Sequence, residues 1–273
     1  MKKTIGIIGF GNMGSAIGGR LKARYQVFVF DKDKNKTQNL AGIKLAKNIK
    51  DLVTRVDVVI LAVKPQDFDS VLSEIKDYAQ DKLIISIAAG ITTAYIQKLL
   101  GDVRAVRVMP NMPVRIGKGM SCLCKGKFAT RDDLGFVRQL FDNLGETLVI
   151  DEGMMDAATA ISGSGPGFWC EFIENKPEDE WESYSQNELI PLFTSAAESI
   201  GFSKKKAGLL AKATVMGSLV TVQSSGEKPL KFKWSIASKG GTTEAALEVL
   251  HRGGTLVEAV KAALRRAKEL SRR

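Results

Sequence analysis

The sequence contains one histidine, His251, among its 273 residues. Catalytic triads and histidine-dependent dehydrogenases need an imidazole to move a proton, and His251 is the only residue that could supply one. His251 lies at the end of an ordinary predicted helix, and we interpret it as structural. The sequence therefore argues against general-base catalysis by histidine.

Cysteine is also scarce: the chain has three, two of them in Cys122-x-Cys124. This spacing gives neither a disulfide framework nor a CxxC metal site, so we expect no metal and interpret the pair as small hydrophobic side chains in a reducing cytosol. No apolar run is long enough to span a membrane, and no signal or transit peptide is recognisable. We therefore expect a cytoplasmic protein without a membrane partner.

The charge is unbalanced, with a formal net charge of +10. The basic residues are spread along the chain, with a local excess in the last predicted helix at Arg265, Arg266, Lys268, Arg272 and Arg273. No interleaving of aromatic and basic residues accompanies them, so we expect no nucleic-acid partner. The excess favours a solvated helix face and a mild attraction for anionic small molecules.

A strand, a glycine turn and a helix are predicted in TIGIIGFGNMG at residues 4–14. The run before the turn is mostly β-branched, as in a strand buried on both faces, and a helical pattern follows the turn. This is the order of the dinucleotide-binding motif G-x-G-x-x-G. Gly9 would make the tight turn, Gly11 would let the backbone approach a pyrophosphate, and Gly14 would let helix and strand pack closely.

The second predicted strand, residues 26–30, ends at Asp31. An acid about 20 residues after the glycines is placed to accept a hydrogen bond from the adenosine ribose. Its carboxylate would repel a 2′-phosphate, which favours NADH slightly over NADPH. Lys32 and Lys34 lie beside it and could reverse that preference, and a solvated turn carboxylate is the alternative interpretation.

Apolar runs then alternate with helical patterns up to about residue 150, which indicates parallel βαβ units. We expect an edge strand at residues 119–124 and a last strand at 146–150. Beyond residue 155 every pattern is helical. The prediction is an α/β fold with a Rossmann-type, doubly wound parallel sheet in residues 1–155, followed by an all-helical domain in residues 156–273.

The helical part holds a second candidate anion site, a glycine turn flanked by hydroxyls at residues 235–244. Its consecutive backbone N–H groups could hold a carboxylate, although the same pattern also suits a well-capped helix. The acidic, proline-containing stretch 175–180 is interpreted as a surface loop. The last helix begins with a capping box, Thr255-x-x-Glu258, and is predicted to run to Arg272.

Six motifs occur in order over nearly the whole length: GFGNMG at 9–14, VKP at 63–65, RVMPNMP at 107–113, SGSGP at 162–166, SGEKP at 225–229 and SKGGTT at 238–243. With these motifs the chain resembles the Δ1-pyrroline-5-carboxylate reductases, which catalyse the last step of proline synthesis. It implies a Rossmann domain, a helical dimerisation domain that intertwines with a second subunit, and a homo-oligomer, dimer or larger, whose active sites are shared between subunits.

The resemblance also implies roles for individual residues. The residues that would line NADH or NADPH are Gly9, Gly11, Asn12, Met13, Asn48, Ala62, Lys64, Pro65 and Ala89. The substrate carboxylate would be held by Ser238, Gly240, Gly241 and Thr242, and Thr243 would contact the ring nitrogen of pyrroline-5-carboxylate. Hydride transfer to a C=N carbon needs no strong general base when the nitrogen arrives protonated, so orientation and a hydrogen-bond partner suffice.

The chain departs from the usual family residues at three of these motifs. Lys239 replaces a proline, Met112 a threonine and Gly167 an alanine, and the stretch near 175–188 resembles an insertion into a continuous helix. Two alternatives follow: a reductase of another cyclic imine, and a catalytically silent paralogue with a regulatory role. A β-hydroxyacid dehydrogenase is disfavoured because residues 151–175 contain no lysine.

Overall fold

The computed structural model describes residues 3–38 and 40–271 of the chain, which form two compact units. Unit 1 consists of the described residues up to Val108 together with Leu123–Leu144, and unit 2 of Met109–Cys122 and the described residues from Gly145 onward. The chain therefore passes between the units more than once. The two-domain division at residue 155 stays a prediction of the sequence.

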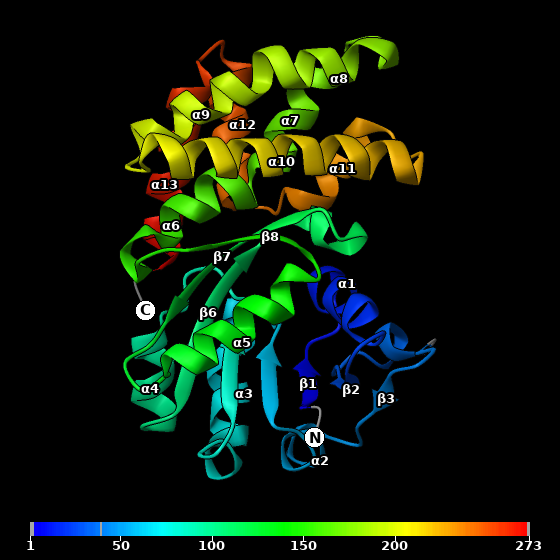
Figure 1. The fold of residues 1–273 in the computed structure, drawn as a ribbon, viewed down its shortest axis with the longest axis vertical. Helices are drawn as coiled ribbons and strands as arrows, with labels where there is room; N and C mark the ends of the chain where they lie inside the picture. Colours follow the sequence, from blue (N-terminus) through cyan, green and yellow to red (C-terminus); the bar gives the residue numbers. More distant parts are fainter. Residues whose placement is uncertain (1–2, 39, 272–273) are drawn as a thin grey trace. The chain divides into compact units, whose positions relative to one another are not determined.

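Eight strands form one sheet in the order β3-β2-β1-β4-β5-β6-β7-β8 (Figure 1). The first six follow the doubly wound order, and neighbouring strands among them pair in parallel, as in Ile5 opposite Val58 and Ile8 opposite Leu61. The central strands are buried on both faces, which explains their unbroken apolar runs. The strands are β1 (Thr4–Ile8), β2 (Gln26–Phe30), β3 (Lys44–Leu45), β4 (Val58–Leu61), β5 (Leu83–Ser86), β6 (Arg104–Pro110), β7 (Gly119–Lys125) and β8 (Gly145–Val149).

The predicted edge strand at residues 119–124 is wrong in its position, because β7 lies between β6 and β8. Gly126 N–H donates to Ala105 O at 2.8 Å and Asn111 N–H donates to Met120 O at 3.1 Å, so β7 runs antiparallel to β6. All residues of β7 except its last are buried. The mostly small and apolar residues of 119–124, with Ser121 among them, were compatible with an interior strand, and periodicity alone could not choose between the two places.

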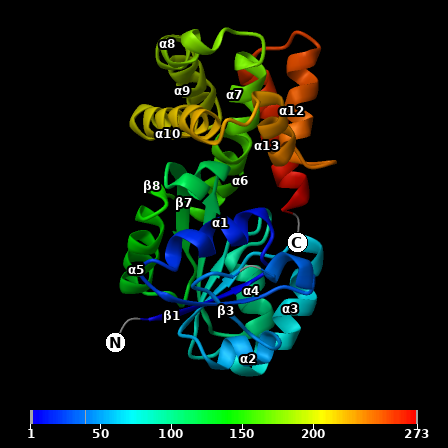
Figure 2. The same ribbon diagram turned by 90° about the vertical axis from the view of Figure 1, so that its right-hand side faces the viewer.

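Five α-helices cover the sheet in unit 1: α1 (Asn12–Leu21), α2 (Ile49–Thr54), α3 (Phe68–Ile75), α4 (Thr93–Leu100) and α5 (Arg131–Asp142). Figure 2 shows α1 and α5 on one face and α2, α3 and α4 on the other. The second face is a continuous core in which Leu52, Phe68 and Ile96 pack against Val59 and Ile84. Short 3-10 helices follow β2, β4 and α3: η1 (Lys34–Thr37), η2 (Pro65–Asp67) and η3 (Lys76–Tyr78).

Side-chain caps fix the starts of several helices. The Thr92 hydroxyl accepts from Tyr95 N–H at 3.0 Å, and Thr130 forms a complete capping box with Asp133. Thr255 and Glu258 form a second capping box at the start of the last helix. That helix ends at Leu270 rather than at Arg272, which lies with Arg273 outside the described residues.

Unit 2 is mainly helical, and its α9 and α10 lie side by side (Figure 1). Across the described residues, no helix combines the length and the apolar character that a membrane crossing requires. The α-helices are α6 (Met155–Ala158), α7 (Gly165–Ile173), α8 (Trp181–Tyr184), α9 (Ile190–Ser199), α10 (Lys204–Ser225), α11 (Pro229–Ile236), α12 (Thr242–His251) and α13 (Leu256–Leu270). Shorter 3-10 and π segments are η4 (Met112–Ile116), η5 (Glu152–Met154), η6 (Thr159–Gly163), η7 (Glu178–Glu180) and η8 (Ser185–Leu189).

The surface loop predicted at 175–180 is only partly correct, because helix resumes within it. Residues 178–180 form η7, and α8 and η8 continue helical structure into α9. The ring of Trp181 packs edge-on against Trp169 with centroids 6.2 Å apart, and Trp169 Nε1–H donates to Ser185 Oγ at 2.9 Å. Trp181 thus anchors the start of α8, next to the acidic residues that made this segment resemble a loop.

Candidate functional site

The glycine turn after β1 has the geometry that its three glycines predict. Gly9 has φ +94°, and a Cβ there would lie 2.6 Å from Ala62 O, so neither the backbone nor the space accepts a side chain. A Cβ on Gly14 would lie 2.1 Å from Gly9 O, which shows how closely α1 packs on the turn. A Cβ on Gly11 would meet no atom within 4 Å. Gly11 therefore presents open backbone at the start of α1, where helix N–H groups attract anions.

The predicted ribose acceptor, Asp31, is engaged with the backbone around the turn. Its Oδ2 accepts from Phe10 N–H at 2.6 Å and its Oδ1 accepts from Asp33 N–H at 2.9 Å. The side chain is 7% exposed, and Lys36 Nζ lies 3.8 Å from Oδ1. Asp31 thus ties the end of β2 to the glycine turn, a role that the strand-end pattern did not reveal.

A hollow of about 500 Å³ adjoins the turn, at the carboxyl ends of β1, β2 and β4. Five of the predicted cofactor residues line it: Gly9, Gly11, Asp31, Ala62 and Lys64. Others lining it include Lys32, Lys36, Asp67 and Glu74. In parallel α/β sheets this edge is where ligands bind, and the hollow is the candidate dinucleotide site of unit 1.

The other predicted cofactor residues do not line this hollow. Asn12 and Met13 begin α1, Pro65 begins η2, and Ala89 is half-buried after β5. Asn48 is exposed and caps α2, accepting from Asp51 N–H at 2.8 Å. Its side-chain oxygen therefore has a structural partner within its own helix.

Charges around the hollow are partly paired. Lys32 Nζ lies 2.6 Å from Asp67 Oδ1, and this hydrogen bond raises the pKa of Lys32. Lys36 lies between Asp31 and Asp33, 3.8 Å and 3.9 Å away. The cations beside the predicted ribose position are thus compensated by neighbouring carboxylates. The Lys32–Asp67 pair is exposed enough to be screened by salt, whereas the Asp31 carboxylate is nearly enclosed.

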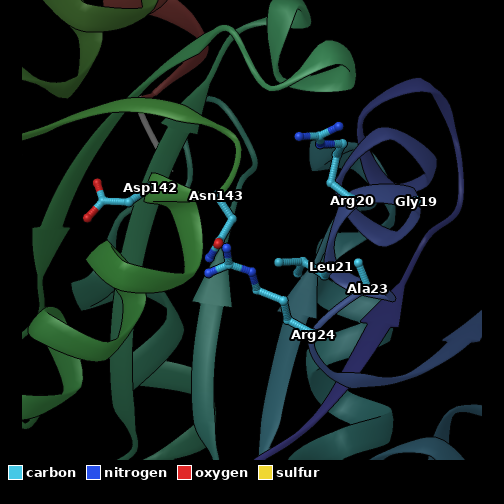
Figure 3. Close-up of a pocket in the computed structure, with 7 residues that line it drawn as sticks. All are labelled: Gly19, Arg20, Leu21, Ala23, Arg24, Asp142 and Asn143. Atoms are coloured by element: carbon cyan, nitrogen blue, oxygen red, sulfur yellow. The ribbon is translucent and has the colours of Figure 1, made fainter.

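A second hollow in unit 1 contains none of the predicted residues. It lies at the end of α1 and of α5, and Figure 3 shows Arg24 directed toward Asn143 while Asp142 points away. Helix C-termini carry a partial negative charge. Despite Arg20 and Arg24, this hollow is therefore a less favourable site for a nucleotide phosphate than the glycine turn.

In unit 2 the second glycine turn connects α11 to α12. Gly240 has φ +68°, and Gly241 N–H donates to Ser238 O at 2.9 Å, which closes a tight turn. The N-cap residue of α12 is Gly241, which has no side chain to occupy the first N–H groups of the helix. The geometry offers backbone donors to an anion at this end of α12.

Two residues that the sequence analysis did not single out hold this turn. Gly240 N–H donates to Glu244 Oε2 at 2.6 Å, and Gly240 O accepts from Arg266 Nε at 2.7 Å. Glu244 directly follows the motif and could have been found there. Arg266 lies on α13 within a run interpreted as a solvated face, and nothing local distinguishes it from its neighbours.

The turn contacts the SGSGP motif at the start of α7. Ser164 Oγ lies 2.8 Å from Thr242 Oγ1, and a Cβ on Gly167 would lie 2.7 Å from Thr243 Cγ2. Thr243, the predicted partner of the ring nitrogen, is 4% exposed. Gly167, where the family usually has alanine, therefore leaves room for the Thr243 methyl group.

Another buried network joins the RVMPNMP and SGSGP motifs inside unit 2. Asn111 Nδ2 donates to Ser162 O and Oγ, both at 3.3 Å, and Asn111 Oδ1 accepts from Met120 N–H at 2.8 Å. Thr214 Oγ1 donates to Ser162 Oγ at 3.2 Å. These motifs thus satisfy each other's buried polar groups, as buried amides and hydroxyls require.

Comparison with known proteins covers the whole chain. Residues 4–90 match the family model described as NADP oxidoreductase, coenzyme F420-dependent, and residues 188–270 match the one described as pyrroline-5-carboxylate reductase dimerisation. The pyrroline-5-carboxylate reductase of Aquifex aeolicus is 33% identical over 276 residues, with 97% of each chain covered. The chain belongs to the pyrroline-5-carboxylate reductase family.

Other members of this family agree in sequence and in structure. The reductase of Escherichia coli is 33% identical over 285 residues, with all of both chains covered. A solved pyrroline-5-carboxylate reductase from Coxiella burnetii is 30% identical with a TM-score of 0.66 over all of both chains. A Plasmodium falciparum pyrroline carboxylate reductase with NADP bound is 28% identical, with a TM-score of 0.65 over 98% of each chain. The chain is therefore an NAD(P)-dependent oxidoreductase with a helical dimerisation domain.

Proposed function

We propose that this protein reduces 1-pyrroline-5-carboxylate to L-proline with NADH or NADPH, the last step of proline biosynthesis. The observation that carries the proposal is the identity of 31–34% to curated pyrroline-5-carboxylate reductases, maintained over essentially the whole chain in most of them. The departures Lys239 and Met112 lie within motifs that otherwise keep the family pattern, and Gly167 directly follows one. Two alternatives compete with this proposal: reduction of a related cyclic imine, and loss of catalytic activity.

The reduced dinucleotide would be held in unit 1 and would supply the hydride from its nicotinamide ring. Gly11 offers backbone donors to the pyrophosphate, and the hollow beside Gly9, Ala62 and Lys64 is large enough for part of the nucleotide. Asn12, Met13, Asn48, Pro65 and Ala89 complete the proposed binding set. A relative with NADP bound supports a nicotinamide cofactor for this protein.

NADH is the cofactor that Asp31 favours. A carboxylate has about four lone-pair positions, and the two backbone N–H groups leave room for a ribose hydroxyl. Lys32, which could otherwise attract a 2′-phosphate, is paired with Asp67 at 2.6 Å. Both observations support a slight preference for NADH.

The substrate carboxylate would bind at the turn formed by Ser238, Gly240, Gly241 and Thr242. Thr243 would donate or accept a hydrogen bond at the ring nitrogen. The ring nitrogen of the substrate is protonated in water before binding. The cofactor transfers a hydride to the C=N carbon and the nitrogen keeps its proton, so proline and the oxidised cofactor are the products. This chain's residues then have to bind and orient the two reactants rather than abstract a proton.

A homo-oligomer is part of the proposal. The dimerisation model matches residues 188–270, a range that includes the turn at 238–243. We propose that association of subunits completes each active site with residues of two chains. A cytoplasmic location is proposed as well, in keeping with three buried cysteines for which the structure describes no disulfide.

Turnover measurements test the proposal directly. Oxidation of NADH and of NADPH is followed with pyrroline-5-carboxylate and with a six-membered cyclic imine acid, and proline is quantified. We expect one proline per cofactor oxidised and a higher kcat/KM for the five-membered ring. Preference for the six-membered ring would assign the chain to another cyclic imine, and absence of turnover with either would indicate a silent paralogue.

A further inference from the structure

Lys233 is a buried cation that the proposed reaction does not use. It lies on α11 and is 4% exposed, and its Nζ donates to Glu171 Oε2 at 2.9 Å and also to Glu174 Oε2. Glu171 lies in the last turn of α7, and Glu174 is the C-cap residue of that helix. Lysine is almost never this buried unless it is paired, and here two carboxylates pair it.

The pairing keeps these groups charged. Burial lowers the pKa of Lys233, but hydrogen bonds to Glu174 and Glu171 outweigh it and raise the pKa overall. Burial likewise raises the pKa of Glu171, but hydrogen bonds from Lys233 and His251 lower it overall. The cluster is therefore an ionic contact between helices at neutral pH.

Glu171 has a second partner on a third helix. Its Oε1 lies 3.1 Å from Nε2 of His251, the last residue of α12. One carboxylate on α7 thus binds Lys233 of α11 through one oxygen and His251 of α12 through the other. His251 has a half-exposed side chain, whereas Lys233 is enclosed.

These two helices are the ones that carry the proposed carboxylate site. Helix α11 ends at Ile236 and α12 begins at Thr242, so the glycine turn is the connection between them. Glu171 fixes both helices to α7, and Ser164 at the other end of α7 contacts Thr242. Next to Lys233, Trp234 is 57% exposed, with its ring centroid 5.8 Å from Lys233 Nζ.

We propose that Glu171, acting through Lys233 and His251, is a positioning residue for the turn at 238–243. By holding α11 and α12 to one helix, it sets the spacing of the turn's backbone donors and therefore the affinity for the substrate carboxylate. The proposal rests on the proposed function in one respect, that this turn binds the substrate acid. A cluster that only stabilised the helices would leave the turn and the substrate affinity unchanged.

His251 offers the matched pair of variants for a test, because its exposure makes folding of either variant secure. His251→Leu removes the hydrogen bond to Glu171, and His251→Gln keeps a donor of similar reach. Amide hydrogen exchange of residues 238–244 and KM for pyrroline-5-carboxylate are measured in the full-length enzyme. We expect His251→Leu to raise both by roughly 10-fold, with NADH affinity unchanged and with His251→Gln close to wild type.

Glu171→Gln extends the test to both partners and should give a larger increase of exchange at the turn than His251→Leu. Glu174→Gln is its control, since Glu174 contacts Lys233 alone within this cluster. A lower melting temperature with unchanged exchange and unchanged KM in His251→Leu and Glu171→Gln would overturn the proposal. If the wild type does not turn over pyrroline-5-carboxylate, the proposed function fails, while hydrogen exchange still decides whether Glu171 positions the turn.

Discussion

The two glycine turns of this protein are each held by a carboxylate, but the carboxylates lie in different kinds of element. In each, one backbone N–H of the turn donates to a carboxylate at 2.6 Å: Phe10 to Asp31, and Gly240 to Glu244. Asp31 comes from the neighbouring strand and is nearly enclosed, whereas Glu244 lies in the first turn of the following helix and is half-buried. The first turn is thus held by the sheet, and the second depends on its helix.

The remaining supports differ in the same way. The first turn needs only β1, β2, β4 and α1, all within the first 62 residues. The second is held by Arg266 of α13 and by Ser164 of α7, and its flanking helices are tied by Glu171. The proposed cofactor turn is thus held by a compact set of neighbouring elements, whereas the proposed substrate turn depends on helices from distant parts of the chain.

Gly9→Ala tests the rigidity of the first turn and should have the largest effect. A Cβ at φ +94° and 2.6 Å from Ala62 O should destabilise unit 1 by about 2–4 kcal/mol and abolish measurable cofactor binding. Gly19→Ala, in the same helix as Gly14 but with open space, should raise stability by about 0.5–1 kcal/mol. Thermal unfolding and NADH titration give the two readouts, and a stable Gly9→Ala variant that binds NADH would contradict the assignment.

Thr243→Val should come next, with kcat lowered by roughly 100-fold because the hydroxyl at the ring nitrogen is lost while the shape is kept. Cofactor affinity should not change, since Thr243 belongs to unit 2. Thr243→Ser restores the hydroxyl and should recover most of the turnover. Equal kcat values in the valine variant and the wild type would remove the role of this residue.

Asp31→Ala should change the ratio of kcat/KM with NADH to that with NADPH by about tenfold in favour of NADPH, since a lost ribose hydrogen bond is worth about 1.4 kcal/mol. Because Asp31 also holds Phe10 N–H, affinity for both cofactors should fall together to some extent. Asp33→Ala, at an exposed neighbouring acid, is the control. A constant NADH to NADPH ratio would leave Asp31 with the turn-holding role alone.

Lys239→Pro should have the smallest effect. Lys239 is exposed on the second turn, where the family usually has proline, and activity should stay within about twofold of wild type or improve, since the variant restores the usual family residue. Because proline restricts the unfolded chain, stability should not fall where the backbone accepts it. Steady-state kinetics with pyrroline-5-carboxylate measure it. Complete loss of activity would show that this protein uses the lysine cation.

Features that depend on residues close together in the sequence could be predicted from it. Gly9 and Gly14, the capping box of Thr255 and the parallel sheet depend on neighbours in the chain or on periodicity, and the structure confirms their geometry. The two-residue strand β3 has both residues exposed, so no apolar pattern marked it.

The features that were missed depend on residues far apart. Asn111 meets Ser162 across 51 positions, Glu171 meets His251 across 80, and the place of β7 depends on β8. No local pattern distinguishes such partners from solvated polar residues. The roles of Gly9, Gly11 and Asp31 came from a binding motif, and those of the other cofactor and substrate residues came from resemblance to a family. All of them remain predictions.

The unequal exposure of the three tryptophans gives this protein a built-in optical probe. Trp169 of α7 and Trp181 of α8 are packed against each other and nearly enclosed, so their emission should hardly respond to solvent or to ligands of unit 2. Trp234 faces water and lies four residues before Ser238. Quenching of its red-shifted component by iodide therefore offers a label-free titration of any acid that binds the second turn.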